Sequence, residues 1–304
     1  GHILGSAIVQ LWLKGNKAMR KLVFSGDLGN PATVLMHDPT DIGQADIVLM
    51  ESTYGNRNHQ NIDNSLDEMA QALEQANRDG GNVFIPAFAL GRSQEILYYL
   101  ALLHHQGRLK QRMIFLDSPM AISITNIYND YLHCLDQKDL AAIGFKNGMQ
   151  LQDLLPMLRL TESVEESMAI NRVSGGAIII AGSGMCNGGR ISHHLKHNLW
   201  KNANHIIFVG FQAKGTLGRR LVDGETRVKV LGQPIVVKAT IHTIGGFSAH
   251  AGQSQLLDWA EHIKGQPQFY LVHGEPQAQR ALQEKLRQRA IEADIATLGQ
   301  TIHL

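Results

Sequence analysis

The stretch VFIPAFALGRSQEILYYLALL, residues 83–103, sets the fold class of this chain. It begins with a short, wholly apolar run, which predicts a strand over 82–86 that is buried on both faces. A glycine follows, and apolar residues then recur at helical spacing, which predicts a helix over 91–105. A buried strand that leads through a short loop into a helix is the repeating unit of a parallel α/β sheet.

The same alternation of helices and strands runs from residue 65 onward. It predicts helices over 65–78, 120–134 and 189–198, and strands over 112–116, 177–181 and 205–210. Ligands of parallel sheets gather at the carboxyl ends of the strands. The stretches that follow the predicted strands are rich in Gly, hydroxyl or Arg residues and suit an anion: AFALGRSQ (87–94), DSPMA (117–121), AGSGMCNGGR (181–190) and GFQAKGTLGRR (210–220).

Both ends of the chain have a different pattern. Residues 8–50 predict short strands joined by turns, and the part after residue 240 predicts a helix, a strand and a final helix near 276–291. We therefore expect a self-contained α/β domain over 58–240, inserted between segments 1–57 and 241–304 of another domain.

Composition excludes several classes of protein. The chain has 304 residues, of which 44% are apolar and 18% charged, as in ordinary globular proteins. The net charge of +1 provides no basic field that would by itself argue for nucleic acid. No apolar run approaches the ~20 residues that span a bilayer, so no membrane partner is expected. Two cysteines make no disulfide framework and suit a reducing cytoplasm.

Five acids and histidines end strand-like runs: His2, Asp27, Glu51, His250 and His273. Polar groups just past apolar strands lie where a rigid sheet can direct them into one cleft. Each of them alone is weak evidence, and a Gly-His pair at the start of a chain can also be the remnant of an expression tag.

Taken together, the motifs around these residues resemble a known family. GHILGSA (1–7), FSGDLGN (24–30), ESTYGN (51–56), FSAHAG (247–252) and LVHGE (271–275) resemble, in this order, the β-CASP branch of metallo-β-lactamase-fold nucleases. That group includes the cleavage and polyadenylation endonuclease and related bacterial and archaeal ribonucleases. The resemblance covers the whole chain. It implies part of an αββα metallo-β-lactamase sandwich, with a β-CASP domain inserted over 58–240.

The resemblance also implies roles for the five residues. His2 matches a ligand of a first zinc ion, Asp27 the carboxylate that bridges two zinc ions, and His273 a ligand of the second zinc that is typical of RNA-directed members. His250 matches the proposed general acid, and Glu51 the acid that orients it. Asp27, Glu51 and His250 are thus expected to act in catalysis, and His2, Asp27 and His273 to bind metal.

Such residues suit hydrolysis of a phosphodiester. Two zinc ions can share a hydroxide and stabilise charge on the attacking and leaving oxygens. A histidine held by a carboxylate can protonate the leaving alkoxide near neutral pH. The resemblance therefore implies a zinc-dependent ribonuclease that acts on single-stranded RNA.

One family motif is absent. Members carry a His-x-His-x-Asp-His motif upstream of the position that His2 matches, and no two histidines of this sequence are separated by one residue. We therefore expect the chain to be the C-terminal portion of a longer protein, to bind zinc poorly and to be inactive as given.

Further residues are candidates for contact with the substrate: Arg92, Ser183, Gly184, Arg190, Lys214 and Ser248. Arg92 has the alternative of an ion pair with Glu95 or Asp117, and Lys214 that of a solvated face shared with Arg219 and Arg220. The glycines around Gly184 equally suit a tight turn. The histidines of HHLKH (193–197) could bind a metal, but without a nearby glutamate base they favour packing or surface roles.

Two other functions stay open from sequence. One is a DNA-directed nuclease of the same superfamily, because the preference for RNA depends on His273 alone. The other is a non-catalytic RNA-binding or scaffold member. Related nucleases often dimerise, so a homodimer is possible, although no residue of this sequence identifies an interface.

Overall fold

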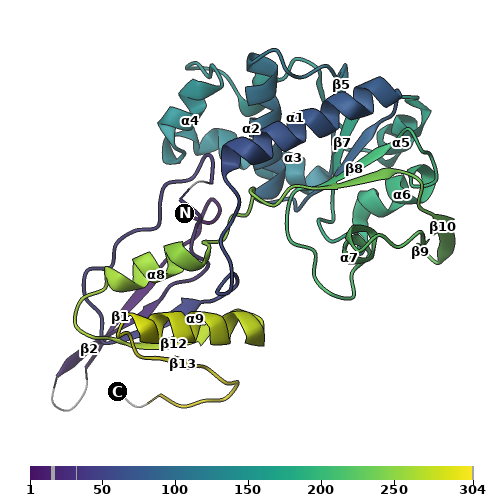
Figure 1. Cartoon of the computed structure of the whole chain (residues 1–304). Coiled ribbons are helices and arrows are strands. Elements are labelled where there is room, and N and C mark those ends of the chain that lie inside the picture. The colour runs from purple at the N-terminus through teal and green to yellow at the C-terminus, as the bar shows by residue number, and fades with distance from the viewer. Residues whose placement is uncertain (15–17, 32, 303–304) are drawn as a thin grey trace. The chain divides into compact units, whose positions relative to one another are not determined.

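The computed structural model describes residues 1–14, 18–31 and 33–302 and divides into two compact units (Figure 1). Unit 1 comprises Gly1–His59 and Ser248–Leu304, and unit 2 comprises Gln60–Phe247. The predicted boundaries, at 58 and 241, fall two and seven residues before those of the structure. The larger difference arises because the strand Thr240–Thr243 pairs with the sheet of unit 2.

Unit 1 is built on a five-stranded sheet of order β1-β2-β3-β12-β13. Its strands are β1 (Val9–Lys14), β2 (Met19–Phe24), β3 (Ile47–Glu51), β12 (Gln268–Val272) and β13 (Ala293–Ile295). The pair β1–β2 is antiparallel, and the other neighbours are parallel. Two helices complete the unit, α8 (Gln253–Glu261) and α9 (Pro276–Gln288).

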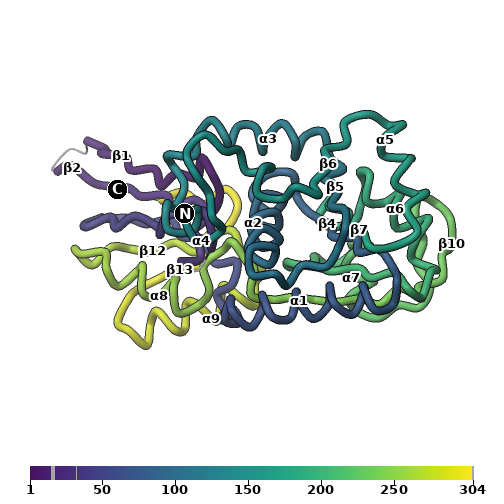
Figure 2. The backbone as a smooth tube through the Cα atoms, turned by 90° about the horizontal axis from the view of Figure 1, so that it is seen from above, coloured from purple at the N-terminus to yellow at the C-terminus, as the bar shows by residue number. Residues whose placement is uncertain are grey.

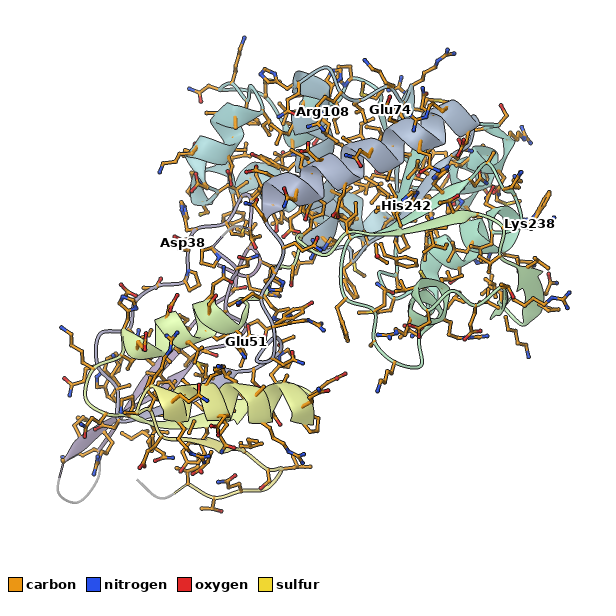
Figure 3. The ribbon with its side chains drawn as sticks, in the orientation of Figure 1. Asp38, Glu51, Glu74, Arg108, Lys238 and His242 are labelled. Atoms are coloured by element: carbon orange, nitrogen blue, oxygen red, sulfur yellow. The ribbon has the colours of Figure 1, made fainter. Side chains whose placement is uncertain are left out.

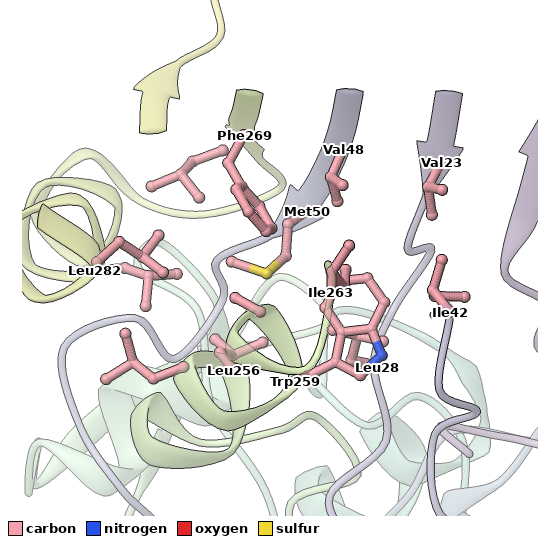
Figure 4. Packing of buried hydrophobic residues seen from close by; sticks show 14 of the residues in the cluster. Val23, Leu28, Ile42, Val48, Met50, Leu256, Trp259, Ile263, Phe269 and Leu282 are labelled. Carbon is pink, nitrogen blue, oxygen red and sulfur yellow. The ribbon is translucent and has the colours of Figure 1, made fainter. Parts of the chain in front are cut away.

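One face of this sheet packs against both helices. Val23, Val48 and Phe269 lie opposite one another in the strand register and share that face. They form one core cluster with Leu256 and Trp259 of α8 and with the buried leucines of α9 (Figure 4). This sheet and its helix layer correspond to one β layer and one α layer of the predicted sandwich.

Unit 2 is built on a wholly parallel six-stranded sheet of order β11-β8-β4-β7-β5-β6. Its strands are β4 (Val83–Pro86), β5 (Met113–Asp117), β6 (Leu158–Leu160), β7 (Ala177–Ala181), β8 (His205–Phe208) and β11 (Thr240–Thr243). Every residue of β4, β7 and β8 is buried, so both faces of the sheet are covered. The parallel α/β sheet predicted from sequence is confirmed.

The helices of unit 2 alternate with its strands. They are α1 (Ile62–Asp79), α2 (Arg92–His105), α3 (Pro119–Asp130), α4 (Gln137–Ala142), α5 (Val164–Ala169), α6 (Gly189–Asn198) and α7 (Leu217–Val222). Residues of α6 and α7 share a core cluster with one face of the sheet, and α1 runs along the unit (Figure 2). A hairpin of β9 (Arg227–Val230) and β10 (Gln233–Val236) packs into the same cluster.

Some elements differ from the sequence-based expectation. The helix predicted over 120–134 ends at Asp130, and a 3₁₀ turn over Leu132–Cys134 follows. The structure adds short 3₁₀ turns over Leu151–Leu154 and Ile170–Arg172. In the described part of the chain, no helix combines the length and the hydropathy that a bilayer span requires.

Candidate active site

Three adjacent parallel strands bring Asp27, Glu51 and His273 to one edge of the unit 1 sheet. Glu51 is the last residue of β3 and pairs with Val272, so His273 follows directly beside it (Glu51 is labelled in Figure 3). Asp27 lies three residues past the end of β2, which pairs with β3. Because parallel strands end at the same edge of a sheet, residues far apart in sequence meet there.

His250 and His2 reach the same edge through irregular backbone. Gly29 and His250 form an antiparallel bridge. The N–H of Asn30 donates to Ala249 at 2.9 Å, and the N–H of Ala251 donates to Leu28 at 2.9 Å. A side chain at Gly29 would overlap the backbone of Gly1, so this glycine lets the segment that carries His2 lie against the loop of Asp27.

The side chains of these segments form one cluster around Asp27. One carboxylate oxygen lies 3.8 Å from Nε2 of His2 and the other 3.2 Å from Nδ1 of His273. The rings of His2 and His250 are 4.3 Å apart. One potential ligand atom from each of His2, Asp27 and His250 lies within 4.8 Å of the other two. The structure thus groups His250 with His2 and Asp27, two of the predicted metal ligands. The third predicted ligand, His273, contacts the other oxygen of Asp27.

Glu51 is the buried anchor of the cluster, with only 1% of its side chain exposed. Its Oε1 accepts from the N–H of Leu28 at 2.6 Å and lies 3.2 Å from Nδ1 of His250. Its Oε2 accepts from the N–H of Thr53 at 3.3 Å. A carboxylate at Nδ1 favours the proton on that nitrogen and leaves Nε2 of His250 directed elsewhere. This pair has the arrangement that an oriented general acid requires.

The environment of His2 suits a metal ligand. Burial, and next the positive charge that His250 can carry, lower the pKa of His2, so its ring is neutral at neutral pH. The buried Nδ1 of His2 makes no hydrogen bond of normal geometry to the described residues. Neutral imidazole and carboxylate are the donors that zinc prefers. A cavity of ≈ 250 Å³ opens beside the cluster and is lined in part by Gly1, Ser25 and Asp27.

Three residues that the sequence did not single out support the histidines. Nε2 of His59 lies 2.8 Å from the carbonyl oxygen of His250 and donates to it, and the ring of Tyr54 packs edge-on against His59. Burial, ahead of other effects, lowers the pKa of His59, which keeps this ring a neutral donor. Thr53 donates to the carbonyl oxygen of His273 at 3.1 Å. Their positions in the sequence could have indicated this role, because all three residues lie within or just after the ESTYGN motif.

The predicted substrate contacts lie mostly in unit 2. Arg92 forms an ion pair with Glu95 at 2.7 Å and donates to the carbonyl oxygen of Phe247, so the pairing with Glu95 that the sequence left open is present. Ser183 is half-buried and Gly184 buried, in the loop after β7. In unit 1, the carbonyl oxygen of Ser248 accepts from the side chain of Asn30.

Arg190 belongs to a buried polar cluster around Asp117. Its guanidinium contacts Asp117 at 2.7 Å and also donates to the carbonyl oxygens of Thr161 and Glu162. His194 of HHLKH donates to the other oxygen of Asp117 at 2.6 Å, and Ser167 donates to that oxygen too. His194 therefore packs inside unit 2. Among the described residues, HHLKH is not part of any group of three potential metal ligands.

This cluster gives a stability prediction with a defined dependence on pH. Burial by itself raises the pKa of Asp117, but hydrogen bonds from His194, Ser167 and Thr161 outweigh burial and lower it from 3.8 to about 2. The carboxylate therefore stabilises the fold at pH values above the ordinary pKa. This contribution is lost as the pH falls from about 4 toward about 2, because the unfolded chain takes up the proton first.

We expect Asp117→Asn to lower the free energy of unfolding at pH 7 by about 3 kcal/mol, because a buried ion pair that loses one partner leaves an uncompensated charge. Urea unfolding should show the gap between wild type and variant narrowing below pH 4. Asp223→Asn is the control, since its ion pair with Arg219 is exposed and should contribute under about 1 kcal/mol. A gap that stays constant from pH 7 to pH 3 would contradict the prediction.

Comparison with known proteins gives matches along most of the chain. The Beta-Casp domain model matches residues 93–221, and the model of the Zn-dependent metallo-hydrolase RNA specificity domain matches residues 234–296. Ribonuclease TTHA0252 of Thermus thermophilus is 40% identical over 99% of this chain and 67% of its own length. Transcription termination factor FttA of Pyrococcus abyssi is 33% identical over 91% of this chain and 43% of its own length. The RNase J-like protein of Methanocaldococcus jannaschii is 32% identical over 90% of this chain and 62% of its own length.

Proposed function

Because this chain belongs to the β-CASP family of metallo-β-lactamase-fold ribonucleases, we propose that it carries catalytic residues of a zinc-dependent enzyme that hydrolyses phosphodiester bonds in single-stranded RNA. One observation carries the proposal. Asp27 faces His2 through one oxygen and His273 through the other, while Glu51 holds His250 beside them. This arrangement supports the proposal, because candidate metal ligands and a candidate proton donor lie together at one sheet edge.

In this proposal the residues of the site have two different roles, metal binding and proton donation. His2, Asp27 and His273 would hold zinc, which when bound stabilises negative charge on the phosphodiester oxygens. His250 in its doubly protonated form would give the proton at Nε2 to the leaving oxygen, while Glu51 at Nδ1 stabilises the charged ring and fixes its orientation. The buried position of Glu51 and its two backbone donors keep this carboxylate in place as the histidine changes its charge.

RNA is the favoured substrate on two grounds. The family model that matches residues 234–296 is described as an RNA specificity domain. The relative that matches 99% of this chain is named a ribonuclease. His273 lies in that matched segment and contacts Asp27. RNA is accordingly the proposed partner.

The number of ligands limits what the 304 residues do alone. A catalytic zinc ion takes about three protein ligands besides water, so two ions need about six ligand positions, more than this edge supplies. We expect the isolated chain to bind zinc weakly and to lack nuclease activity. Metal analysis of the purified chain after dialysis tests this, and two tightly held zinc ions per chain would contradict it.

The function is tested by cleavage of labelled oligonucleotides. With the full-length protein and zinc, single-stranded RNA should be cut at least about tenfold faster than DNA of the same sequence, since a polar site that contacts the 2′-hydroxyl distinguishes the two. Duplex RNA serves as the second comparison. Equal or faster cleavage of DNA would favour a DNA-directed nuclease, and binding of RNA without cleavage would favour a scaffold member.

A further inference from the structure

Two phenylalanines stand out at the carboxyl edge of the unit 2 sheet. Phe88 follows β4 and is 49% exposed, and Phe211 follows β8 and is 41% exposed. These strands are neighbours in the sheet, and both are buried throughout. Large apolar rings exposed on loops at the ligand-binding edge of a parallel sheet are candidates for contact with a ligand.

Phe88 is held in place by its surroundings. The hydroxyl and the N–H of Ser93 both donate to its carbonyl oxygen, at 2.7 and 3.2 Å. Its ring lies against Gly184, where an added Cβ would come within 2.9 Å of two ring carbons. Gly184 therefore lets the ring pack on backbone, and about half of the side chain is left open.

The loop that carries Phe211 is tied to the same glycine. The side-chain amide of the buried Gln212 donates to the carbonyl oxygen of Gly184 at 3.0 Å and to that of Phe211 at 3.1 Å. Three loops, after β4, β7 and β8, thus meet around Gly184. Both rings are mounted on a common, hydrogen-bonded support.

The loop that carries Phe211 also carries an exposed lysine. Lys214, three residues after Phe211, is exposed and makes no ion pair with any residue that the structure describes. The arginines of the neighbouring loops differ, because each is paired with an acid: Arg92 with Glu95, Arg190 with Asp117, Arg219 with Asp223 and Arg220 with Glu225. Lys214 is therefore an exposed cation without an ion pair to the described residues, on the same loop as Phe211.

We propose that Phe88 and Phe211 form a stacking site for unpaired bases of RNA, with Lys214 on the adjoining phosphate. Single strands are bound by exposed aromatic rings that stack on bases and by cations that follow the backbone, and duplex bases are not accessible to such rings. The proposal rests on the proposed RNA-directed function and adds a binding site in unit 2, outside the cluster around Asp27.

The test measures binding without cleavage. Fluorescence anisotropy of an oligouridylate of about 12 nucleotides, with EDTA present, gives the dissociation constant of the 304-residue chain. Phe88→Ala should weaken binding about 5- to 150-fold, and Phe211→Ala by a similar factor, the range for the loss of one stacked base. Phe88→Trp should retain wild-type affinity, because it retains an aromatic face.

Two controls separate stacking from a structural effect. Trp200→Ala removes an aromatic ring that is 53% exposed next to Lys201, in the loop between α6 and β8, and should leave binding unchanged. An abasic oligonucleotide keeps the phosphates but lacks bases, so wild type and Phe88→Ala should bind it equally. Circular dichroism of each variant verifies that the fold is retained.

The proposal is overturned if Phe88→Ala binds the oligouridylate as wild type does, if it weakens binding to abasic RNA by the same factor, or if the wild-type chain binds no RNA. Failure of the proposed catalytic function gives a different pattern. In that case the full-length protein would not cleave RNA, while the chain's affinity for RNA would still depend on Phe88.

Discussion

Asp27→Ala in the full-length protein should abolish RNA cleavage and metal binding together. Asp27 faces two histidines through its two oxygens, at 3.8 and 3.2 Å, and no other described carboxylate forms part of a potential metal group with these rings. A bound metal supplies several kcal/mol of charge stabilisation, so its loss should slow cleavage by at least about a thousandfold.

Cleavage rates under single-turnover conditions, with zinc measured in the same samples, check this prediction. Asp41→Ala is the matched control, since Asp41 is an exposed aspartate of the same unit and lies outside the cluster. Addition of excess zinc should not restore the activity of Asp27→Ala. A variant that keeps both its zinc and its activity would exclude Asp27 as a ligand.

His250→Ala should slow cleavage by about 10²- to 10⁴-fold while zinc content stays near that of wild type, because loss of a general acid has an effect of that size. The structure makes this a sharp test. Nδ1 of His250 faces Glu51. One ring nitrogen of His250 also lies within 4.8 Å of potential ligand atoms of His2 and Asp27, so His250 could bind the same metal ion. A ligand and a proton donor would behave differently in this experiment.

The same samples distinguish the two roles. If His250 is the proton donor, the zinc content is retained and the chemical step is slow. If zinc is lost in His250→Ala as it is in Asp27→Ala, His250 is a ligand and its assignment as the acid is wrong. His262→Ala is the control, since His262 is an exposed histidine in the same unit at the end of α8.

The central elements of the fold could be predicted from sequence. The strand over Ala177–Ala181 and the helix over Gly189–Asn198 have the predicted bounds, because a wholly apolar run and a glycine-rich turn mark their ends. β6 and β11 were missed. Each has only three or four residues, and β11 (Thr240–Thr243) has a single apolar residue, Ile241, so the hydrophobic pattern is too short to indicate a strand.

The candidate site could be predicted in its residues but not in its contacts. Ordered motifs identified His2, Asp27, Glu51, His250 and His273, and the structure places all five in unit 1. No pattern in the sequence indicated that Asp117 pairs with Arg190, or that His59 supports His250. Such pairings join segments that pack together only after the sheets have formed.

The sequence by itself determined the family, the parallel sheet and the residue types of the site, because motif order and hydrophobic periodicity are local properties of the chain. Only the tertiary structure decided which groups meet. Glu51 and His250 are 199 positions apart in sequence and in hydrogen-bond distance in the fold. Tertiary packing likewise decided which aromatic rings are exposed to solvent. Phe84 and Phe88 are four residues apart, yet Phe84 is buried and about half of Phe88 is exposed.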